Sequence, residues 1–506
     1  MTQTPTLALD ASLPPDDTPT QPQYVITNAD KERVQRIQAA WKAYEGELEK
    51  PLEKMPGQAD DNVLSNRMQA VVDRGEEFLF GKELEISVEE DAPEDVQDIL
   101  DTTWGEKEAR IPLLEKLEMN GAMSGQGFLR IVKHADGSLR IVVIDPAIVY
   151  VKTAPQDCDM VTLYCLEYCE DQQEAEGKSS PEKVYYREEI SLLDPRGVYN
   201  PTRWFDSQAN AGVSWQIQHW TRIGDKGNWT PAGEPLAWPS PFPPLFSCQN
   251  LPKPNNFWGY PDITPDLIGL NNSLNLVQSN INRTEKIYGN PFLWAKGMGE
   301  SIVDVAPGKV TGLPPDGEMG AVTISTDVGN ALQFANNVRS DIDEQSAVPG
   351  VATGRIADIP RGNISGIALS LLFMPLMKKT DKKRCLYGKL ILDVSKAILV
   401  LSGMSGSIKL TLNWQNPLPN DDLASWQTAA LEKQAGVSDT TILEERGYDP
   451  DEEMTRNQAE DAVKLTNFSR GQGFPPIPPQ PQEQPGAQPE QGEQPPMSGQ
   501  QQGGEQ

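Results

Sequence analysis

One stretch of the sequence, from Asn255 to Gly403, constrains the fold more than any other. At its centre, Val348 to Gly366 carries glycines and prolines at irregular spacing, which is incompatible with a regular helix or strand. Loops of this length are uncommon in compact domains and are usually functional or disordered. Apolar residues argue against disorder here; they are Val351, Ile356, Ile359 and Ile364. We therefore predict a functional loop held between helices.

Helical patterns flank this loop. Thr264 suits an N-cap and Pro265 the first helical position, and the periodic pattern continues to Ile287. A second helix is predicted after Thr326-Asp327, so the two form an antiparallel pair. Their apolar seams have steps of three and four: Ile263, Leu267, Leu270, Leu274, Val277 and Ile281 on the first, with Val328, Ala331, Leu332, Ala335, Val338 and Ile342 on the second. The other face of the first helix is polar, with Asn271, Asn272, Asn275, Ser279 and Asn282.

Residues 292–325 have the pattern of short strands and turns and predict a small β module between the two helices. After the loop, Ser365 can cap a long helix that reaches Leu401. Pro375 lies inside this helix, where the missing N–H and the ring clash predict a kink.

The chain before Asn250 predicts helices followed by an antiparallel sheet. Helical spacing covers 28–44, 66–80 and 94–120, with a strand at 82–88. Alternating strands follow at 128–133, 139–146, 160–169, 183–192 and 215–221. A late strand at 408–414 can return to this central sheet, and helices are predicted at 423–434 and 452–465. The tryptophans of this region are predicted to pack in the core or in loops.

Charge and composition exclude several classes of function. The chain has 44 Lys+Arg against 73 Asp+Glu and a formal net charge of −29, which disfavours general phosphate binding. A Gly-x-x-x-x-Gly-Lys-Ser/Thr motif is absent, and the 2 histidines leave little material for a triad or a metal centre. We therefore predict neither a catalytic site, nor a metal site, nor a cofactor.

The 5 cysteines are sparse and odd in number, so we expect reduced thiols in a cytoplasmic setting. Cys165 and Cys169 lie in an alternating strand pattern, which disfavours a zinc site. The chain opens without a basic and apolar signal segment, and its most apolar run, Ile367 to Met377, is too short for a bilayer span. We expect no membrane partner.

A basic cluster interrupts this acidic chain, with Lys378, Lys379, Lys382, Lys383 and Arg384. One interpretation is a solvated or salt-bridging helix face. The other is a local contact with nucleic acid or a partner protein.

Several ordered motifs resemble the portal proteins of long-tailed bacteriophages. Asn66 to Lys82 is similar to the early helix and strand start of that family, and Trp258 to Asn275 to the segment that opens the first stem helix. Ile364-Ser-Gly-Ile-Ala-Leu369 resembles the signature after the tunnel loop, and Gly436 to Glu453 the C-terminal pattern. The resemblance covers roughly Asn28 to Leu465 in order, interrupted by polar insertions near 171–183 and 194–212.

The resemblance implies an α+β portal-type fold. In chain order it implies a disordered N-terminal arm (1–27), a wing of helices and antiparallel sheet (28–254), a first stem helix (255–291), a clip (292–325), a second stem helix (326–348), a tunnel loop (349–366), a long kinked helix with a wing strand (367–419), a helical crown (420–469) and a disordered Pro/Gln-rich tail (470–506).

The resemblance also implies a function and partners. The chain would form a homo-oligomeric ring, twelve-fold in the virion, at one capsid vertex, with no enzymatic activity. Double-stranded DNA would pass through it without sequence-specific contacts. The implied protein partners are the terminase large subunit, the head–tail connectors, and the major capsid and scaffolding proteins. The implied location is the virion, with the host cytoplasm during assembly.

Site residues follow from the same resemblance. The tunnel loop would place in the DNA channel Val351, Thr353, Arg355, Ile356, Asp358, Ile359, Arg361, Asn363 and Ile364. The clip would meet the terminase and connectors through Phe292, Trp294, Lys296, Lys309, Asp316 and Glu318. Subunits would pack along the stem through the first-helix seam with Leu332, Val338 and Ile342.

Arg355 and Arg361 are the only cations of the loop, and we hypothesise that they touch DNA phosphates transiently. The alternative is that each pairs with Asp358 or with a neighbouring subunit. For the whole chain, the alternatives to a portal are a minor head enzyme, with the loop as an active-site lid, and a scaffold that never meets DNA.

Overall fold

The computed structural model of the chain describes two compact units, residues 1–419 and residues 420–506, each considered by itself. The described residues are 21–57, 59–89, 92–93, 95–105, 108–171, 183–193, 205, 210, 212–238, 240–289, 292–296, 316–322, 328–355, 366–418, 432–433, 436–445, 449–450 and 453–456.

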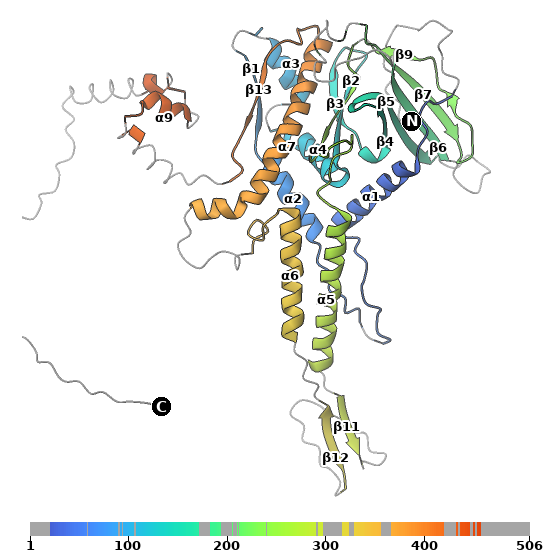
Figure 1. The fold of residues 1–506 in the computed structure, drawn as a ribbon, viewed down its shortest axis with the longest axis vertical. Helices are drawn as coiled ribbons and strands as arrows, with labels where there is room; N and C mark the ends of the chain where they lie inside the picture. Colours follow the sequence, from blue (N-terminus) through green and yellow to red (C-terminus); the bar gives the residue numbers. More distant parts are fainter. Residues whose placement is uncertain are drawn as a thin grey trace, which may run out of the picture. The chain divides into compact units, whose positions relative to one another are not determined.

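Helices and antiparallel strands alternate along the first unit (Figure 1). The α-helices are α1 (Asn28–Glu45), α2 (Arg67–Phe80), α3 (Asp95–Trp104), α4 (Ile111–Ser124), α5 (Pro265–Gly289), α6 (Val328–Ser346) and α7 (Gly366–Leu401), with a short 3₁₀ turn η2 (Pro146–Ile148). The strands are β1 (Leu84–Val88), β2 (Gln126–Lys133), β3 (Leu139–Val143), β4 (Val149–Ala154), β5 (Asp157–Asp171), β6 (Lys183–Leu192), β7 (Trp215–Ile223), β8 (Thr230–Pro231), β9 (Leu236–Trp238), β10 (Leu245–Gln249), β11 (Phe292–Lys296), β12 (Glu318–Val322) and β13 (Leu410–Trp414).

Every strand pair within the described residues is antiparallel, as the alternating sequence patterns predict. The largest sheet has the order β4-β5-β6-β7-β8, with β9 also paired to β7, and a smaller sheet has the order β10-β2-β3. The coarse prediction of a mixed helical and antiparallel-sheet protein is therefore confirmed. The placement of the last strand is a correction, because β13 pairs with β1 in a separate sheet rather than with the central sheet.

Local capping explains where several helices begin and end. The Asn66 side chain accepts hydrogen bonds from the Met68 and Gln69 N–H groups at the start of α2. Gly125, with φ of 85°, ends α4 in the left-handed region that favours glycine.

The helix predicted over 94–120 is two helices. Gly105 has a φ of 85° after α3, so the chain turns before α4 begins. The buried Arg110 guanidinium stabilises this turn, donating to the carbonyl oxygens of Gly105 and Leu84 at 3.1 Å each and to Asp101 at 2.8 Å. The apolar periodicity is similar on both sides of the turn, and for that reason the pattern alone predicts one helix.

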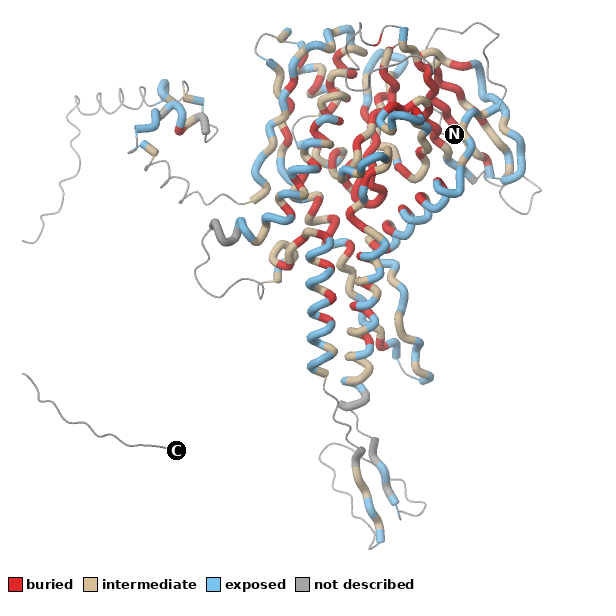
Figure 2. Tube along the Cα trace, in the orientation of Figure 1, coloured by how far each residue is buried: buried red, intermediate tan, exposed pale blue. Residues whose placement is uncertain are grey.

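Two large apolar clusters form the core beneath these sheets. One joins α3, α4 and β1 to the C-terminal half of α7, and the other lies on the six-stranded sheet. Figure 2 shows the contrast between the buried strands of that sheet and α6, which is exposed apart from residues at helical intervals. Trp215, Trp220 and Trp238 are buried, which confirms the prediction that they are packing residues.

The long helix α7 contains Pro375, and Figure 1 shows it changing direction along its length, as predicted. Leu376, next to the proline, is buried with Val71 and Val348. The bent N-terminal part of α7 therefore packs on α2 and on the end of α6.

The second unit contains α9 (Asp439–Glu445). Most of the helices predicted at 423–434 and 452–465 lies outside the described residues. Within the part of the chain that the structure describes, no helix is sufficiently long and apolar to cross a lipid bilayer.

Candidate functional site

The helices α5 and α6 pack side by side and run antiparallel (Figure 1). One lysine shows the direction of both, because the Lys379 ammonium on α7 contacts the Asp262 carboxylate just before α5 and the Ser346 carbonyl oxygen at the end of α6, each at 2.8 Å. The start of one helix therefore lies beside the end of the other. With 25 residues, α5 is about 37 Å long at about 1.5 Å per residue.

The apolar seam of this pair is buried within one chain. Six of the predicted seam residues are almost fully buried in a cluster that also includes residues of α1, α2 and α4: Ile263, Leu267, Leu274, Ala335, Val338 and Ile342. Leu270 and Val277 are partly buried against the same cluster, and Ile281 is half-buried. These side chains already have partners inside the chain, so contacts between subunits are not needed to explain their pattern. Leu332 differs, because it is 52% exposed.

A ladder of hydrogen bonds occupies the polar face of α5. Asn271, Asn275 and Ser279 are buried, and they accept the backbone N–H groups of Arg67 (3.1 Å), Ser65 (2.8 Å) and Val63 (2.9 Å), respectively. Further along, Asn282 donates to the Asp61 carbonyl oxygen at 2.7 Å, and the Arg283 guanidinium pairs with the Asp61 carboxylate. The extended segment from Asp61 to Arg67 is therefore held along α5.

Spacing makes this ladder possible. Four helical residues rise about 6 Å, and two extended residues rise about 6.6 Å. Steps of four along α5 therefore match steps of two along the segment, and alternate N–H groups meet successive side chains. The repeat of Asn and Ser at steps of four is the signal in the sequence that could have indicated such a partner.

The predicted loop begins as consecutive turns after α6. Carbonyl oxygens of Pro349, Gly350 and Val351 accept backbone N–H groups three to five residues later, at 2.9 to 3.1 Å. Thr353 also donates its hydroxyl to the Gly350 carbonyl oxygen at 2.9 Å. Val351 and Thr353 are half-buried, and Ile356, Asp358, Ile359, Arg361, Asn363 and Ile364 lie outside the described residues.

Arg355 at the end of these turns forms an ion pair with Asp343 on α6. Asp343 also contacts the Arg67 guanidinium of α2 at 3.3 Å. Asp343 is thus a partner of Arg355 that was not considered from the sequence, and Asp358 lies outside the described residues. One carboxylate holds together the loop entrance, α2 and α6.

The basic cluster of α7 includes a buried ionic network. Lys383 is 1% exposed, and its ammonium contacts the carboxylates of Glu118 on α4 and Asp262. Burial alone would raise the pKa of Asp262, but the ammonium groups of Lys379 and Lys383 outweigh it and lower the pKa. For these two lysines the salt-bridging interpretation is confirmed, and Lys378 and Lys382 are exposed.

Glu76 on α2 lies among other carboxylates, and its ionisation makes the folding stability depend on pH. Burial, with the charges of Glu115, Glu118, Glu77 and Asp73, raises its pKa to about 8. Because the pKa of Glu76 is higher in the folded than in the unfolded protein, its protonated carboxyl contributes fully to folding stability below the unfolded-state pKa. This contribution is lost as the pH rises through about 8. Glu76→Gln should therefore increase the free energy of unfolding by about 1–2 kcal/mol at pH 8–9, allowing for solvent screening, and by less at pH 5.

Urea unfolding of both proteins across pH 5 to 9 would measure this difference. The exposed Glu344→Gln on α6 serves as the matched control, since it removes a carboxylate outside this cluster. A Glu76→Gln effect that did not grow with pH would show that Glu76 is not held protonated.

Strands β11 and β12 form a hairpin in the segment between α5 and α6. Trp294 is 45% exposed, and Lys296, Asp316 and Glu318 are also exposed. The structure does not describe the side chain of Phe292 or any part of Lys309. The hairpin thus presents an aromatic and charged surface.

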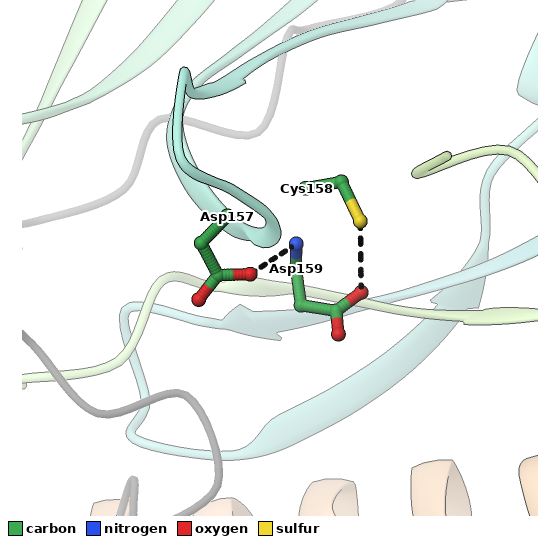
Figure 3. Close-up of side chains that lie close together, drawn as sticks. All are labelled: Asp157, Cys158 and Asp159. Carbon is green, nitrogen blue, oxygen red and sulfur yellow. Dashed lines mark hydrogen bonds between the residues drawn. The ribbon is translucent and has the colours of Figure 1, made fainter. Parts of the chain in front are cut away.

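Metal chemistry finds little support among the described residues. Cys165 and Cys169 lie on β5, where four residues span about 13 Å, too far apart for a shared ion. Asp157, Cys158 and Asp159 have potential ligand atoms within 4.8 Å of one another (Figure 3). Their contacts are those of a turn, since the Asp159 N–H donates to Asp157 at 2.9 Å and both aspartates are exposed.

These features describe an α+β protein that contains an antiparallel helix pair, α5 and α6, and a long bent helix, α7. The sequence from residue 24 to 464 matches the family described as "Phage portal protein, SPP1 Gp6-like". Because this match spans most of the chain, the protein belongs to the phage portal protein family. It is a virion protein that forms the portal ring and DNA channel, and its family is structural rather than enzymatic.

No curated protein matches the chain. Among solved structures, one from the virion of a native gene transfer agent particle is 12% identical with a TM-score of 0.41, covering 82% of this chain and 94% of that chain. A chain from the neck of the native particle computed with C12 symmetry is 13% identical (TM-score 0.38; 76% and 90% covered). A chain from the neck of the empty particle computed with C6 symmetry is 14% identical (TM-score 0.42; 79% and 96% covered). Because these sequence identities and TM-scores are low, the assignment to the portal protein family depends on the family match alone.

Proposed function

We propose that α5 and α6 form the stem of the portal ring, the β11–β12 hairpin belongs to the clip, and the segment that begins with the turns after α6 forms the tunnel loop. Residues before α5 then supply most of the wing and those after residue 419 the crown. The order of these elements along the chain supports this division. A twelve-fold ring, suggested by the C12 symmetry of the gene transfer agent neck, is part of the same proposal.

Exposed apolar side chains on the helix pair carry the proposal. After the seam is buried inside the chain, Leu332 and Phe334 on α6 remain 52% and 53% exposed, and Leu276 on α5 remains 41% exposed. Large apolar side chains exposed on packed helices are suited to burial against another protein. A neighbouring copy in the ring would remove them from water.

Substitution of these residues tests the ring contact. The double variant Leu332→Asp/Phe334→Asp should fold, because both side chains are exposed, but should lose rings, since each truncated anchor costs about 2 kcal/mol or more of association free energy. Negative-stain microscopy and size-exclusion chromatography measure this. Leu274→Asp is unsuitable, because Leu274 is fully buried and a charge there would unfold the chain itself.

Gln333→Asp places the same charge on an exposed residue between the two and is the control. Normal rings from the double variant would contradict the assignment of this surface to subunit packing. Aggregated or unfolded double variant would be seen by circular dichroism and separated from a specific assembly defect.

Partners follow from this arrangement. Double-stranded DNA would pass through the ring, the clip would meet the terminase large subunit and later the head–tail connectors, and the outer body would meet the capsid and scaffolding proteins. Assembly would take place in the host cytoplasm. The net charge of −29 supports a channel in which DNA slides, because an acidic wall gives few sites that hold phosphate.

A further inference from the structure

Three arginines from different parts of the chain gather near Asp343. Arg67 begins α2, Arg339 lies one helical turn before Asp343 on the same face of α6, and Arg355 ends the turns that follow α6. Asp343 contacts both Arg67 and Arg355. In a chain with a large excess of carboxylates, such a grouping of guanidinium groups is unusual.

Arg339 is the member of this group whose charge is not paired with a carboxylate of the described residues. Among the residues that the structure describes, Arg339 forms no ion pair, and its guanidinium donates to the amide oxygen of Asn336 at 3.3 Å. Burial lowers its pKa, and the positive charges of Arg67 and Arg355 lower it further. The mutual repulsion of the three guanidinium groups would be relieved by an oxyanion bound between them.

The arginines are accessible to such a ligand. The side chains of Arg67 and Arg355 are 18% and 29% exposed, and Arg339 is half-buried. Their forked donors suit a phosphate group, which offers several oxygens. The group lies at the entrance to the segment assigned above to the tunnel loop, where DNA would pass.

We infer that Arg67, Arg339 and Arg355 form a binding site for a phosphate of the DNA backbone, and that Asp343 competes with that phosphate for Arg67 and Arg355. This inference rests on the proposed DNA channel. The competition makes the contact weak and reversible, because a phosphate that enters displaces a carboxylate already in place. Such a site can guide moving DNA without holding it.

The test is the affinity of purified full-length protein for a short fluorescein-labelled double-stranded DNA, measured by fluorescence anisotropy at several salt concentrations. Arg339→Gln should weaken binding about tenfold, as expected for loss of one charge-assisted hydrogen bond, and should reduce the salt slope by about 1. Asp343→Asn should do the opposite and tighten binding by about threefold to tenfold, because the competing carboxylate is gone.

Matched controls lie on the same helices. Arg74→Gln removes an arginine of α2 outside the group, and Asp341→Asn removes an exposed carboxylate of α6 two residues from Asp343. Neither should change the affinity. Thermal melts of each variant show whether it is folded, and Arg339→Lys, which keeps the charge, should retain part of the affinity.

Negative-stain images of the same samples separate the possible outcomes. Unchanged affinity of Arg339→Gln, or weaker binding by Asp343→Asn in a folded protein, would overturn the site. Loss of rings in Arg339→Gln would also overturn it and assign the arginines to a neighbouring subunit. If the unmodified protein formed no rings while Arg339→Gln still bound DNA more weakly, the proposed stem contact between subunits would fail and the phosphate site would stand.

Discussion

Replacement of Lys383 by methionine should strongly lower the free energy of unfolding of the protein. Lys383 is buried between the carboxylates of Glu118 and Asp262, and methionine would fill similar space without the charge. Removing one partner of a buried ion pair costs about 3–5 kcal/mol, because the charge of the other partner, here Glu118, stays buried and uncompensated. Urea unfolding should report this loss in the free energy of unfolding, and thermal unfolding a lower Tm.

Lys382→Met is the control, since Lys382 is the preceding residue of α7 and is exposed. It should change the free energy of unfolding by no more than about 0.5 kcal/mol. A double variant in which Glu118 becomes Gln and Lys383 becomes Met should recover part of the lost stability, because Asp262 stays paired with Lys379 and the buried Glu118 charge is gone. Equal stability of Lys383→Met and the natural chain would show that the network contributes nothing to folding.

The second large effect is expected on the ladder along α5. Asn271→Ala/Asn275→Ala removes the acceptors of the Arg67 and Ser65 N–H groups. Each buried donor left without a partner costs about 1–3 kcal/mol, so the pair should cost about 2–6 kcal/mol. Hydrogen exchange at Val63 to Arg67 should accelerate, because this segment loses its contacts with the helix.

The matched control is Asn280→Ala, which changes an exposed asparagine of the same helix. It should leave both stability and exchange close to those of the natural chain. If the double variant kept slow exchange at Ser65 and Arg67, other contacts would be sufficient to hold the segment, and the ladder would not be its principal support.

The sequence predicted much of the architecture because regular elements have local causes. The period of the apolar residues predicted α1, α2, α5, α6 and three strands of the central sheet, β5, β6 and β7, but not β4, β8 or β9. The capping residue Thr264 marked where α5 begins, and Pro375 marked the bend in α7. The boundary between α3 and α4 was missed, because the turn there depends on a buried Arg110 that binds backbone oxygens from β1 and from the turn itself.

Ion pairs between residues far apart in the chain could not be predicted from the sequence. Lys379 and Lys383 look like their exposed neighbours in the basic cluster, and only the fold brings Glu118 and Asp262 to them from positions more than a hundred residues earlier. The same holds for Arg355, whose partner Asp343 lies outside the loop. The subunit contacts and the division into stem, clip, loop and crown remain predictions.

The helix α5 shows which properties the sequence determines and which depend on the tertiary structure. The sequence alone determined that Pro265 to Gly289 forms a helix with one apolar and one polar face, because side-chain spacing and capping are local properties. Only the tertiary structure decided what covers each face: the apolar seam packs on α6 and the preceding helices of the same chain, and the asparagines bind the segment before α2. The physical reason is that the spacing of apolar and polar residues along the sequence predicts which helix face must be buried. Which segment covers that face depends on distant parts of the chain that folding brings together.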